Sequence, residues 1–337
     1  MKDARPLATA LADPVAVLGF GPDDWTSLLS IARAERLDGS LAFRLADMPL
    51  PGPVARALED ARAQAEFGRA QGLWEVEMAR RALAPLGVAP ILLKGSAFAF
   101  AGLPAAVGRL VGDLDILVPR DRLDDVETAL LDAGFSWAKD DDYTHAYYRR
   151  WMHELPPLVH FDRGAMIDVH HTILPLTARR TPDADALIAD SIEISAGVRI
   201  LSPADMIVHA ACHLFADGDM AGGLRNLWDI DRLLRLFTAH PDFWKTLDAR
   251  ARLHQMHEPV ALALRLADRL FATPVEPRLA GHDRVRDGLF IRRLLARDGW
   301  GRPIRPLNRL GFYIRSHWMR MPPLMLARHL WIKARAK

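Results

Sequence analysis

Hydrophobic residues recur at two different spacings along the chain, and these spacings predict its elements. From residue 53 to residue 86 the sequence is rich in Ala, Arg, Glu and Leu, and its apolar side chains fit one face of a helix. The stretch ends at Pro85-Leu86-Gly87, which is a typical helix stop. We therefore expect a long helix here, whose apolar face includes Leu73, Val76, Met78 and Leu83.

A set of short apolar stretches follows, and their length and alternation are typical of strands. The strands that we expect are residues 88–93, 113–118, 144–155, 158–161 and 165–170. Asp162-Arg163-Gly164 has the composition of a tight turn between the last two. Short helices are expected between some of these strands, at residues 97–103 and 121–133, the second stopped by Gly134.

After Ser202-Pro203 the helical pattern returns. We expect breaks between these helices at Gly222-Gly223, Pro241, Pro259, Pro274 and Pro277. The patterns together predict an α+β fold, with a small mixed β-sheet flanked by N-terminal and C-terminal helical regions. The boundaries that we expect are residues 1–86, 87–180 and 181–337, with a basic tail ending the last region.

Composition indicates a folded chain in a reducing compartment. The 337 residues are 50% hydrophobic and 26% charged, which allows a full core and disfavours disorder. The single cysteine, Cys212, cannot form an internal disulfide, and the first residues have no apolar stretch of a secretory signal. No uncharged apolar run approaches the roughly 18 to 20 residues that cross a bilayer. We expect a cytoplasmic protein that is soluble or peripheral to a membrane.

Positive charge is concentrated at the end of the chain. Residues 299–337 contain nine Lys and Arg and no acid, while the rest has 35 bases against 42 acids, a balance of about −7. A tail of this composition can bind nucleic acid or an anionic membrane. We favour a terminal helix that packs on the domain with its bases in solvent.

The candidate chemistry begins with acids inside apolar strands. Asp113 and Asp115 are two apart in the Gly112–Val118 stretch, so both project to one face of a strand. Asp168 lies between Ile167 and Val169 of another strand. Carboxylates brought together repel one another unless a cation lies between them, and Mg²⁺ favours such oxygens. The alternative is that these acids are strand-end residues facing solvent.

Lys94-Gly95-Ser96 directly follows the first expected strand. A glycine allows close approach of the backbone to a phosphate, and amides at the start of a helix favour anions. Ser96 can donate a hydroxyl hydrogen bond, and Lys94 can offset phosphate charge. The tripeptide lacks the surrounding pattern of a P-loop, so by itself it also fits an ordinary turn.

These motifs together resemble the polymerase-beta-like nucleotidyltransferase superfamily, whose pattern is a Gly-Ser turn, then Asp-x-Asp, then a third Asp. The resemblance covers residues 88–171 and is closest to a bacterial branch with Leu-Lys-Gly, Asp-Leu-Asp-Ile-Leu-Val and Asp-x-His motifs, continuing weakly through residues 209–231. It implies that the Gly-Ser turn holds a nucleoside triphosphate. It also implies that Asp113, Asp115 and Asp168 bind Mg²⁺ or Mn²⁺ and that Asp168 helps to activate the acceptor.

The function implied is transfer of a nucleoside monophosphate to a hydroxyl, with release of pyrophosphate and two metal ions as cofactors. The acceptor is open: a protein, a small molecule, a peptide, a sugar or RNA. Arg109 either reaches a phosphate or is a solvated loop charge. The alternatives are a nucleotide-binding or partner-binding protein without turnover on the same scaffold, and a toxin-like transferase acting on RNA.

The histidines raise a further question. His209 and His213 are four apart on an expected helix and could grip zinc, but no catalytic glutamate lies between them in the usual motif. We favour packing for them, or for His213 a contact to nucleotide or acceptor. His153 and Glu154 belong either to the site or to its rim. The tryptophans, including Trp228, Trp244 and Trp318, are expected to anchor the core.

Overall fold

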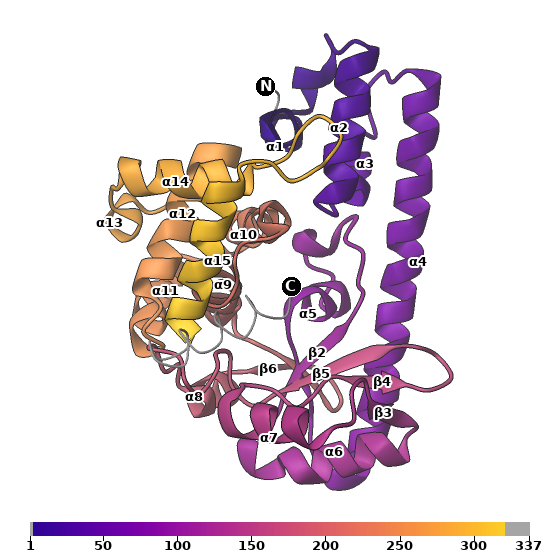
Figure 1. Ribbon diagram of the computed structural model, residues 1–337, viewed down its shortest axis with the longest axis vertical. Helices are drawn as coiled ribbons and strands as arrows, with labels where there is room; N and C mark the ends of the chain where they lie inside the picture. The colour runs from indigo at the N-terminus through magenta and orange to yellow at the C-terminus, as the bar shows by residue number, and fades with distance from the viewer. Residues whose placement is uncertain (1–2, 321–337) are drawn as a thin grey trace.

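The computed structural model describes residues 3–320 and has an α+β fold, as the sequence predicted (Figure 1). One mixed sheet of seven strands lies between helices that precede it and helices that follow it. Its strands are β1 (Ile91–Leu92), β2 (Leu114–Leu117), β3 (Phe135–Trp137), β4 (Leu158–His160), β5 (Met166–His170), β6 (Ile192–Ser195) and β7 (Val198–Ile200).

The order of the strands in the sheet is β3-β4-β5-β2-β1-β7-β6, which places β2 at the centre. β2 is antiparallel to β1 and parallel to β5, and all four of its residues are buried. The register sets Asp115 directly opposite Asp168. Since side chains at paired positions of neighbouring strands project to the same face, this register brings carboxylates from two distant segments together. β4 and β5 form the expected hairpin.

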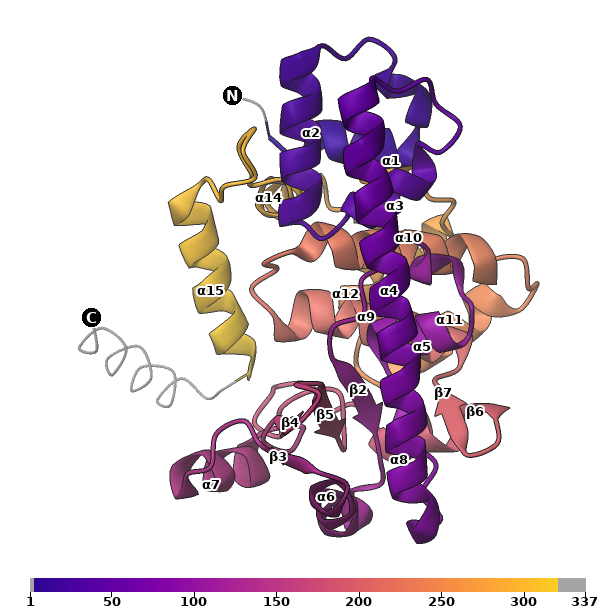
Figure 2. The ribbon, with the colours of Figure 1, turned by 90° about the vertical axis from the view of Figure 1, so that its right-hand side faces the viewer.

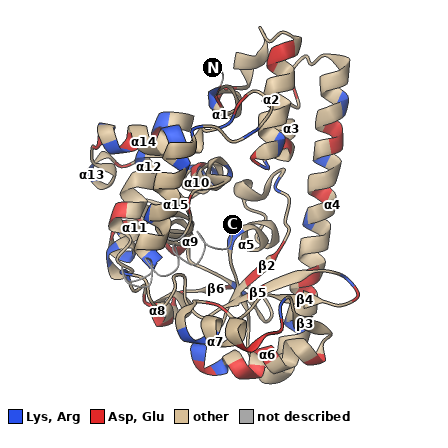
Figure 3. Cartoon of the chain, in the orientation of Figure 1, with Lys and Arg blue, Asp and Glu red and all other residues tan. Residues whose placement is uncertain are grey.

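The N-terminal region is helical, and its longest helix runs along the molecule. α1 (Arg5–Ala12), α2 (Pro22–Ala34) and α3 (Asp38–Arg44) form a group at one end. α4 (Gly52–Leu83) connects that group to the sheet, as Figures 1 and 2 show. Its buried residues are three or four positions apart, as a single helical face requires, except for one longer interval between Gly68 and Val76: Val54, Leu58, Ala61, Ala65, Gly68, Val76, Ala79 and Leu83. Figure 3 shows acidic and basic residues interspersed along the helix.

The C-terminal region packs a second group of helices on the other side of the centre (Figure 1). They are α8 (Ala184–Ala189), α9 (Pro203–Cys212) with the π-helical turn His213–Asp217, α10 (Gly223–Phe237), α11 (Phe243–Leu253), α12 (His257–Phe271), α13 (Pro277–Ala280), α14 (Arg284–Leu294) and α15 (Pro306–Arg320). The break expected at Pro259 falls at residues 254–256, between α11 and α12, and the proline itself lies in the first turn of α12, where its missing N–H costs no helical hydrogen bond.

The strand expected at residues 144–155 is also wrong. Most of this stretch is helix α7 (Asp142–Trp151), whose first turn is capped by Asp141 accepting a hydrogen bond from the Thr144 amide. Tyr147 and Trp151 are four apart on one face of this helix, with ring centroids 5.4 Å apart. The β3 strand and the β6–β7 hairpin were missed.

The start of the basic tail packs on the domain as expected. In α15, Phe312 contacts Phe290 of α14 edge-on with ring centroids 4.9 Å apart, and Arg315 donates a hydrogen bond to the Phe215 carbonyl. The bases from Arg328 to Lys337 lie outside the described residues. No helix in residues 3–320 combines the length and apolar character that crossing a bilayer requires.

A glycine contact joins the N-terminal helices to the loop that precedes β2. Gly39 of α3 packs on Gly108, so that a Cβ at Gly39 would lie 2.4 Å from the Gly108 carbonyl oxygen. Gly108 has a φ of +66°, which disfavours any other residue. Beside them, the Ser40 hydroxyl donates to the Val107 carbonyl and accepts from Arg225 of α10. The three parts of the chain therefore meet at this junction.

Gly39→Ala tests the junction. We expect it to reduce the free energy of unfolding by about 1–3 kcal/mol, because the backbone atoms that it meets cannot move aside as a flexible side chain would. The matched control is Gly288→Ala in α14, where a Cβ has open space and alanine favours the helix. Denaturant unfolding measures both variants. Equal midpoints would contradict the close approach.

Candidate functional site

The first turn of helix α5 (Lys94–Phe100) begins directly after β1 and faces the acidic strand. The Leu93 amide donates to the Asp115 carbonyl, which fixes the end of β1 against β2. Lys94 then adopts a left-handed backbone conformation with a φ of +48°. Such a conformation costs about 1–3 kcal/mol in a residue other than glycine and is held by surrounding contacts. The contact here is an ion pair, with Lys94 Nζ 2.5 Å from Asp115 Oδ1.

The three acids singled out in the sequence come together at this point. One carboxylate oxygen from each of Asp113, Asp115 and Asp168 lies within 4.8 Å of the others. Asp115 is buried, Asp168 is partly buried and Asp113 is exposed, so the cluster lies between core and solvent. Asp168 Oδ1 is buried without a hydrogen-bond partner. Three oxygens at this spacing, one of them unpaired, suit a hard divalent cation.

The pKa values of Asp115 and Asp168 show the effects of burial and of neighbouring charges on the cluster. Burial would raise the pKa of Asp115, but the charge of Lys94 and the hydrogen bond from His170 hold it below its ordinary value. Burial and the negative charges of Asp115 and Asp113 raise the pKa of Asp168 to about 6. Both interactions of Asp115 use Oδ1, so neither occupies Oδ2. Added positive charge beside Asp168 would favour its ionised form.

The residues of the Gly-Ser turn have different surroundings. Ser96 is buried, and its hydroxyl donates to the Asp113 carbonyl at 3.2 Å, so it supports the acidic strand. Gly95 lies under Arg109, because a Cβ there would be 2.4 Å from Arg109 Nε. Arg109 forms an ion pair with Asp229 and its side chain is only 16% exposed. The alternative that Arg109 is a solvated loop charge is therefore wrong.

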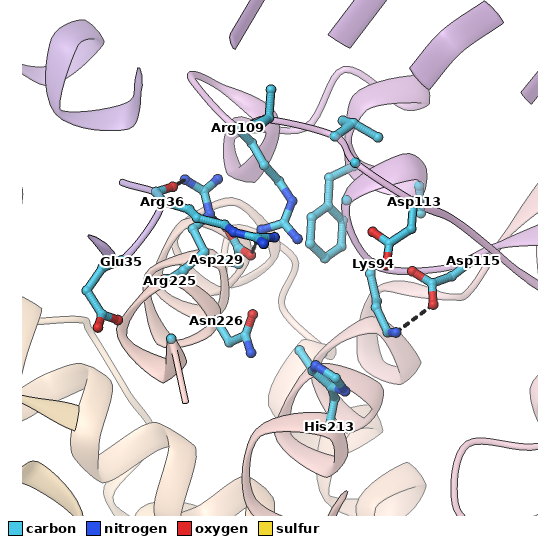
Figure 4. Close-up of a pocket in the computed structure, with 18 of the residues that line it drawn as sticks. Glu35, Arg36, Lys94, Arg109, Asp113, Asp115, His213, Arg225, Asn226 and Asp229 are labelled. Atoms are coloured by element: carbon cyan, nitrogen blue, oxygen red, sulfur yellow. Dashed lines mark hydrogen bonds and ion pairs between the residues drawn. The ribbon is translucent and has the colours of Figure 1, made fainter. Parts of the chain in front are cut away.

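A cavity of about 480 Å³ adjoins the acids, within the size range of small-molecule sites. Figure 4 shows Lys94, Asp113 and Asp115 on one side of it and Arg36, Arg225 and Asp229 on the other, with Arg109 between them. The lining residues come from the end of α2, from α5, from the loop before β2, and from α9 and α10. The cavity is therefore built by all three parts of the chain.

The side of the cavity away from the acids is basic. Four arginines line it (Arg36, Arg109, Arg225 and Arg297), against two acids, Glu35 and Asp229. Arg225 and Arg109 both pair with Asp229, and Arg297 pairs with Glu35. Arg36 is exposed, has a φ of +55°, and is the arginine of this set with no ion pair among the described residues. An excess of positive charge thus faces the acidic side across the cavity.

Sequence reasoning missed most of this basic side. Arg225 and Asp229 are four apart on α10 and both are buried, with Nε to Oδ1 at 3.1 Å. An arginine and an acid four residues apart on one helix are a signal that sequence alone offers. No comparable signal marks Arg36, because its place beside the cavity depends on how α2 packs.

The histidines divide into two groups. His209 and His213 line the cavity, and burial together with the charge of Lys94 holds the pKa of His209 well below its ordinary value. Neither belongs to a group of three potential metal ligands among residues 3–320. His153 and Glu154 instead lie beside His170 and near the acids. Burial is the main cause that raises the pKa of Glu154, to about 7, while His170 opposes it.

Comparison with known protein families assigns the chain to a family. A family model described as "Uncharacterised nucleotidyltransferase" matches residues 21–272, about three quarters of the chain. The matched range contains all seven strands, the three acids and helices α9 and α10. No curated protein matches the sequence. This chain is a member of that uncharacterised nucleotidyltransferase family.

Proposed function

We propose that the protein transfers a nucleoside monophosphate from a nucleoside triphosphate to a hydroxyl acceptor and releases pyrophosphate. The observation that carries the proposal is the cluster of Asp113, Asp115 and Asp168, of which Asp113 and Asp115 line a cavity whose other side is basic. Membership in a nucleotidyltransferase family supports transferase chemistry. The cavity is large enough for a nucleotide.

The three aspartates are the residues that would hold Mg²⁺ or Mn²⁺. Their fit to such an ion rests on the all-carboxylate donor set and on the unpaired, buried Oδ1 of Asp168. When bound, two such ions stabilise negative charge on the attacking and departing oxygens. Lys94 remains beside Asp115 and offsets part of the charge brought by the triphosphate.

The chain's own residues account for orientation and proton transfer. The acceptor oxygen forms a bond to the α-phosphorus as the bond from that phosphorus to the pyrophosphate oxygen breaks. Asp168, whose carboxylate lies in the cluster with Asp113 and Asp115, would lower the cost of deprotonating the hydroxyl. Gly95 makes room for the Arg109 side chain at the start of α5, and Arg109 and Arg36 line the cavity where they would offset the charge of the departing pyrophosphate.

Asp113→Asn tests the role of the cluster. We expect at least a hundredfold loss of magnesium-dependent nucleotide transfer, because one ligand of the cation is lost while the exposed side chain keeps its shape. Release of pyrophosphate and incorporation of α-labelled phosphate from nucleoside triphosphates in cell extract measure it. Asp132→Asn, an exposed change on α6 (Leu123–Asp132), is the control. Unchanged transfer by Asp113→Asn, at an unchanged unfolding temperature, would reject the assignment.

Metal addition provides a readout that needs no acceptor. We expect Mg²⁺ or Mn²⁺ to raise the unfolding temperature of the wild-type protein, because a ligand that binds only the folded state stabilises it by mass action. The rise should disappear in Asp113→Asn and in Asp168→Asn and persist in Asp132→Asn. Differential scanning calorimetry with and without a chelator tests this. An equal rise in all four proteins would place the cation elsewhere.

Arg36→Ala tests the orientation of the nucleotide. We expect the KM for the nucleoside triphosphate to rise about threefold to tenfold, since one charge-assisted contact to phosphate is lost. Arg33→Ala is the matched control, because Arg33 is exposed in the last turn of α2, three residues before Arg36, and does not line the cavity. Steady-state kinetics distinguish the two variants. Identical KM values would show that the triphosphate does not reach the basic side.

A further inference from the structure

A second cluster of potential ligands lies beside the three aspartates and shares none of its members with them. It is formed by His153, Glu154 and His170. The segment after α7 runs antiparallel to β5, with Glu154 paired to His170. The His171 amide donates to the His153 carbonyl, and the Leu155 amide donates to the Val169 carbonyl, each at 2.9 Å. These backbone hydrogen bonds therefore hold the segment with His153 and Glu154 beside His170.

The spacing of the ligand atoms fits a tetrahedral metal ion. Glu154 Oε2 lies 3.4 Å from His170 Nδ1 and 3.8 Å from His153 Nε2. In a tetrahedral zinc site with bonds of roughly 2.0–2.1 Å, neighbouring ligand atoms are about 3.3 Å apart. Small side-chain movements close the difference. Two imidazole nitrogens and one carboxylate oxygen are also a donor set that zinc accepts with a fourth position left open.

The polar side-chain atoms of this cluster are incompletely paired, and a bound cation would compensate for the missing contacts. His170 Nε2 lies 3.0 Å from Asp115 Oδ1, so the contact with Asp115 does not use Nδ1. His170 Nδ1 is instead turned toward the carboxylate of Glu154, where a cation could lie between the two side chains. His153 is only 7% exposed, its Nδ1 has no hydrogen-bond partner, and its Nε2 is beyond hydrogen-bond distance of Glu154.

We propose that His153, Glu154 and His170 bind a zinc ion, separate from the divalent cations of the three aspartates. The ion would clamp the segment after α7 to β5. It would also fix the His170 ring with Nε2–H toward Asp115, the arrangement in which a metal-bound histidine donates its other nitrogen to a carboxylate. The zinc site would thereby position one of the three aspartates. This inference does not depend on nucleotidyl transfer.

Cobalt(II) replaces zinc and reports tetrahedral geometry by intense visible absorption. We expect chelator-treated, full-length protein to bind one Co²⁺ with this spectrum and to lose it on addition of one equivalent of Zn²⁺. His153→Ala and Glu154→Gln should weaken Co²⁺ binding at least tenfold. Glu154→Gln preserves the volume of the side chain, so it remains informative if His153→Ala fails to fold. His240→Ala, which removes an exposed histidine, and Asp113→Asn should bind Co²⁺ as the wild type does.

Three results would overturn the proposal. The wild type could show no tetrahedral Co²⁺ spectrum, which would mean that the cluster is held by protons alone. Both His153→Ala and Glu154→Gln could leave the spectrum unchanged, which would place the ion elsewhere. Asp113→Asn could abolish the spectrum, which would assign the ion to the three aspartates.

Discussion

Repulsion among three carboxylates is the constraint on which the arrangement of this protein depends. The parallel pairing of β2 with β5 sets Asp115 opposite Asp168, and Asp113 precedes them on the same face. Without compensation such a cluster opposes folding. Lys94 and His170 supply part of the compensation, and both do so at Oδ1 of Asp115. The raised pKa of Asp168 marks the part of the repulsion that these two residues leave uncompensated.

The helical regions complete the site rather than merely cover the sheet. Arg225 of α10 pairs with Asp229, donates to the Ser40 hydroxyl and reaches the Ala105 carbonyl, so a single buried side chain joins all three parts of the chain. Arg109 makes a similar connection from the loop before β2 to Asp229. The cavity therefore exists only when the N-terminal and C-terminal helices are both in place. The residues that line it are acidic on one side and basic on the other.

The sequence predicted the parts of this arrangement that depend on local periodicity. Alternation placed Asp113 and Asp115 on one face of a strand, and the apolar neighbours of Asp168 placed it in another. The order of the strands, which decides that these faces meet, is set by pairing between distant segments and was not predictable from alternation. The strand expected at residues 144–155 is wrong because the Asp141 cap and the contact between Tyr147 and Trp151, four residues apart, stabilise helix α7. The positions of Arg36 and His153 beside the site depend on tertiary packing, which local sequence patterns do not predict.

A crystal structure with Mn²⁺ and a nucleoside triphosphate analogue that resists transfer is the most direct test of the central claim. Manganese is located by its anomalous scattering, independently of the interpretation of neighbouring density. The account predicts manganese bound by carboxylate oxygens of Asp113, Asp115 and Asp168, with the triphosphate extending over Gly95 toward Arg109. It is contradicted if manganese is absent from the three aspartates while the nucleotide occupies the cavity.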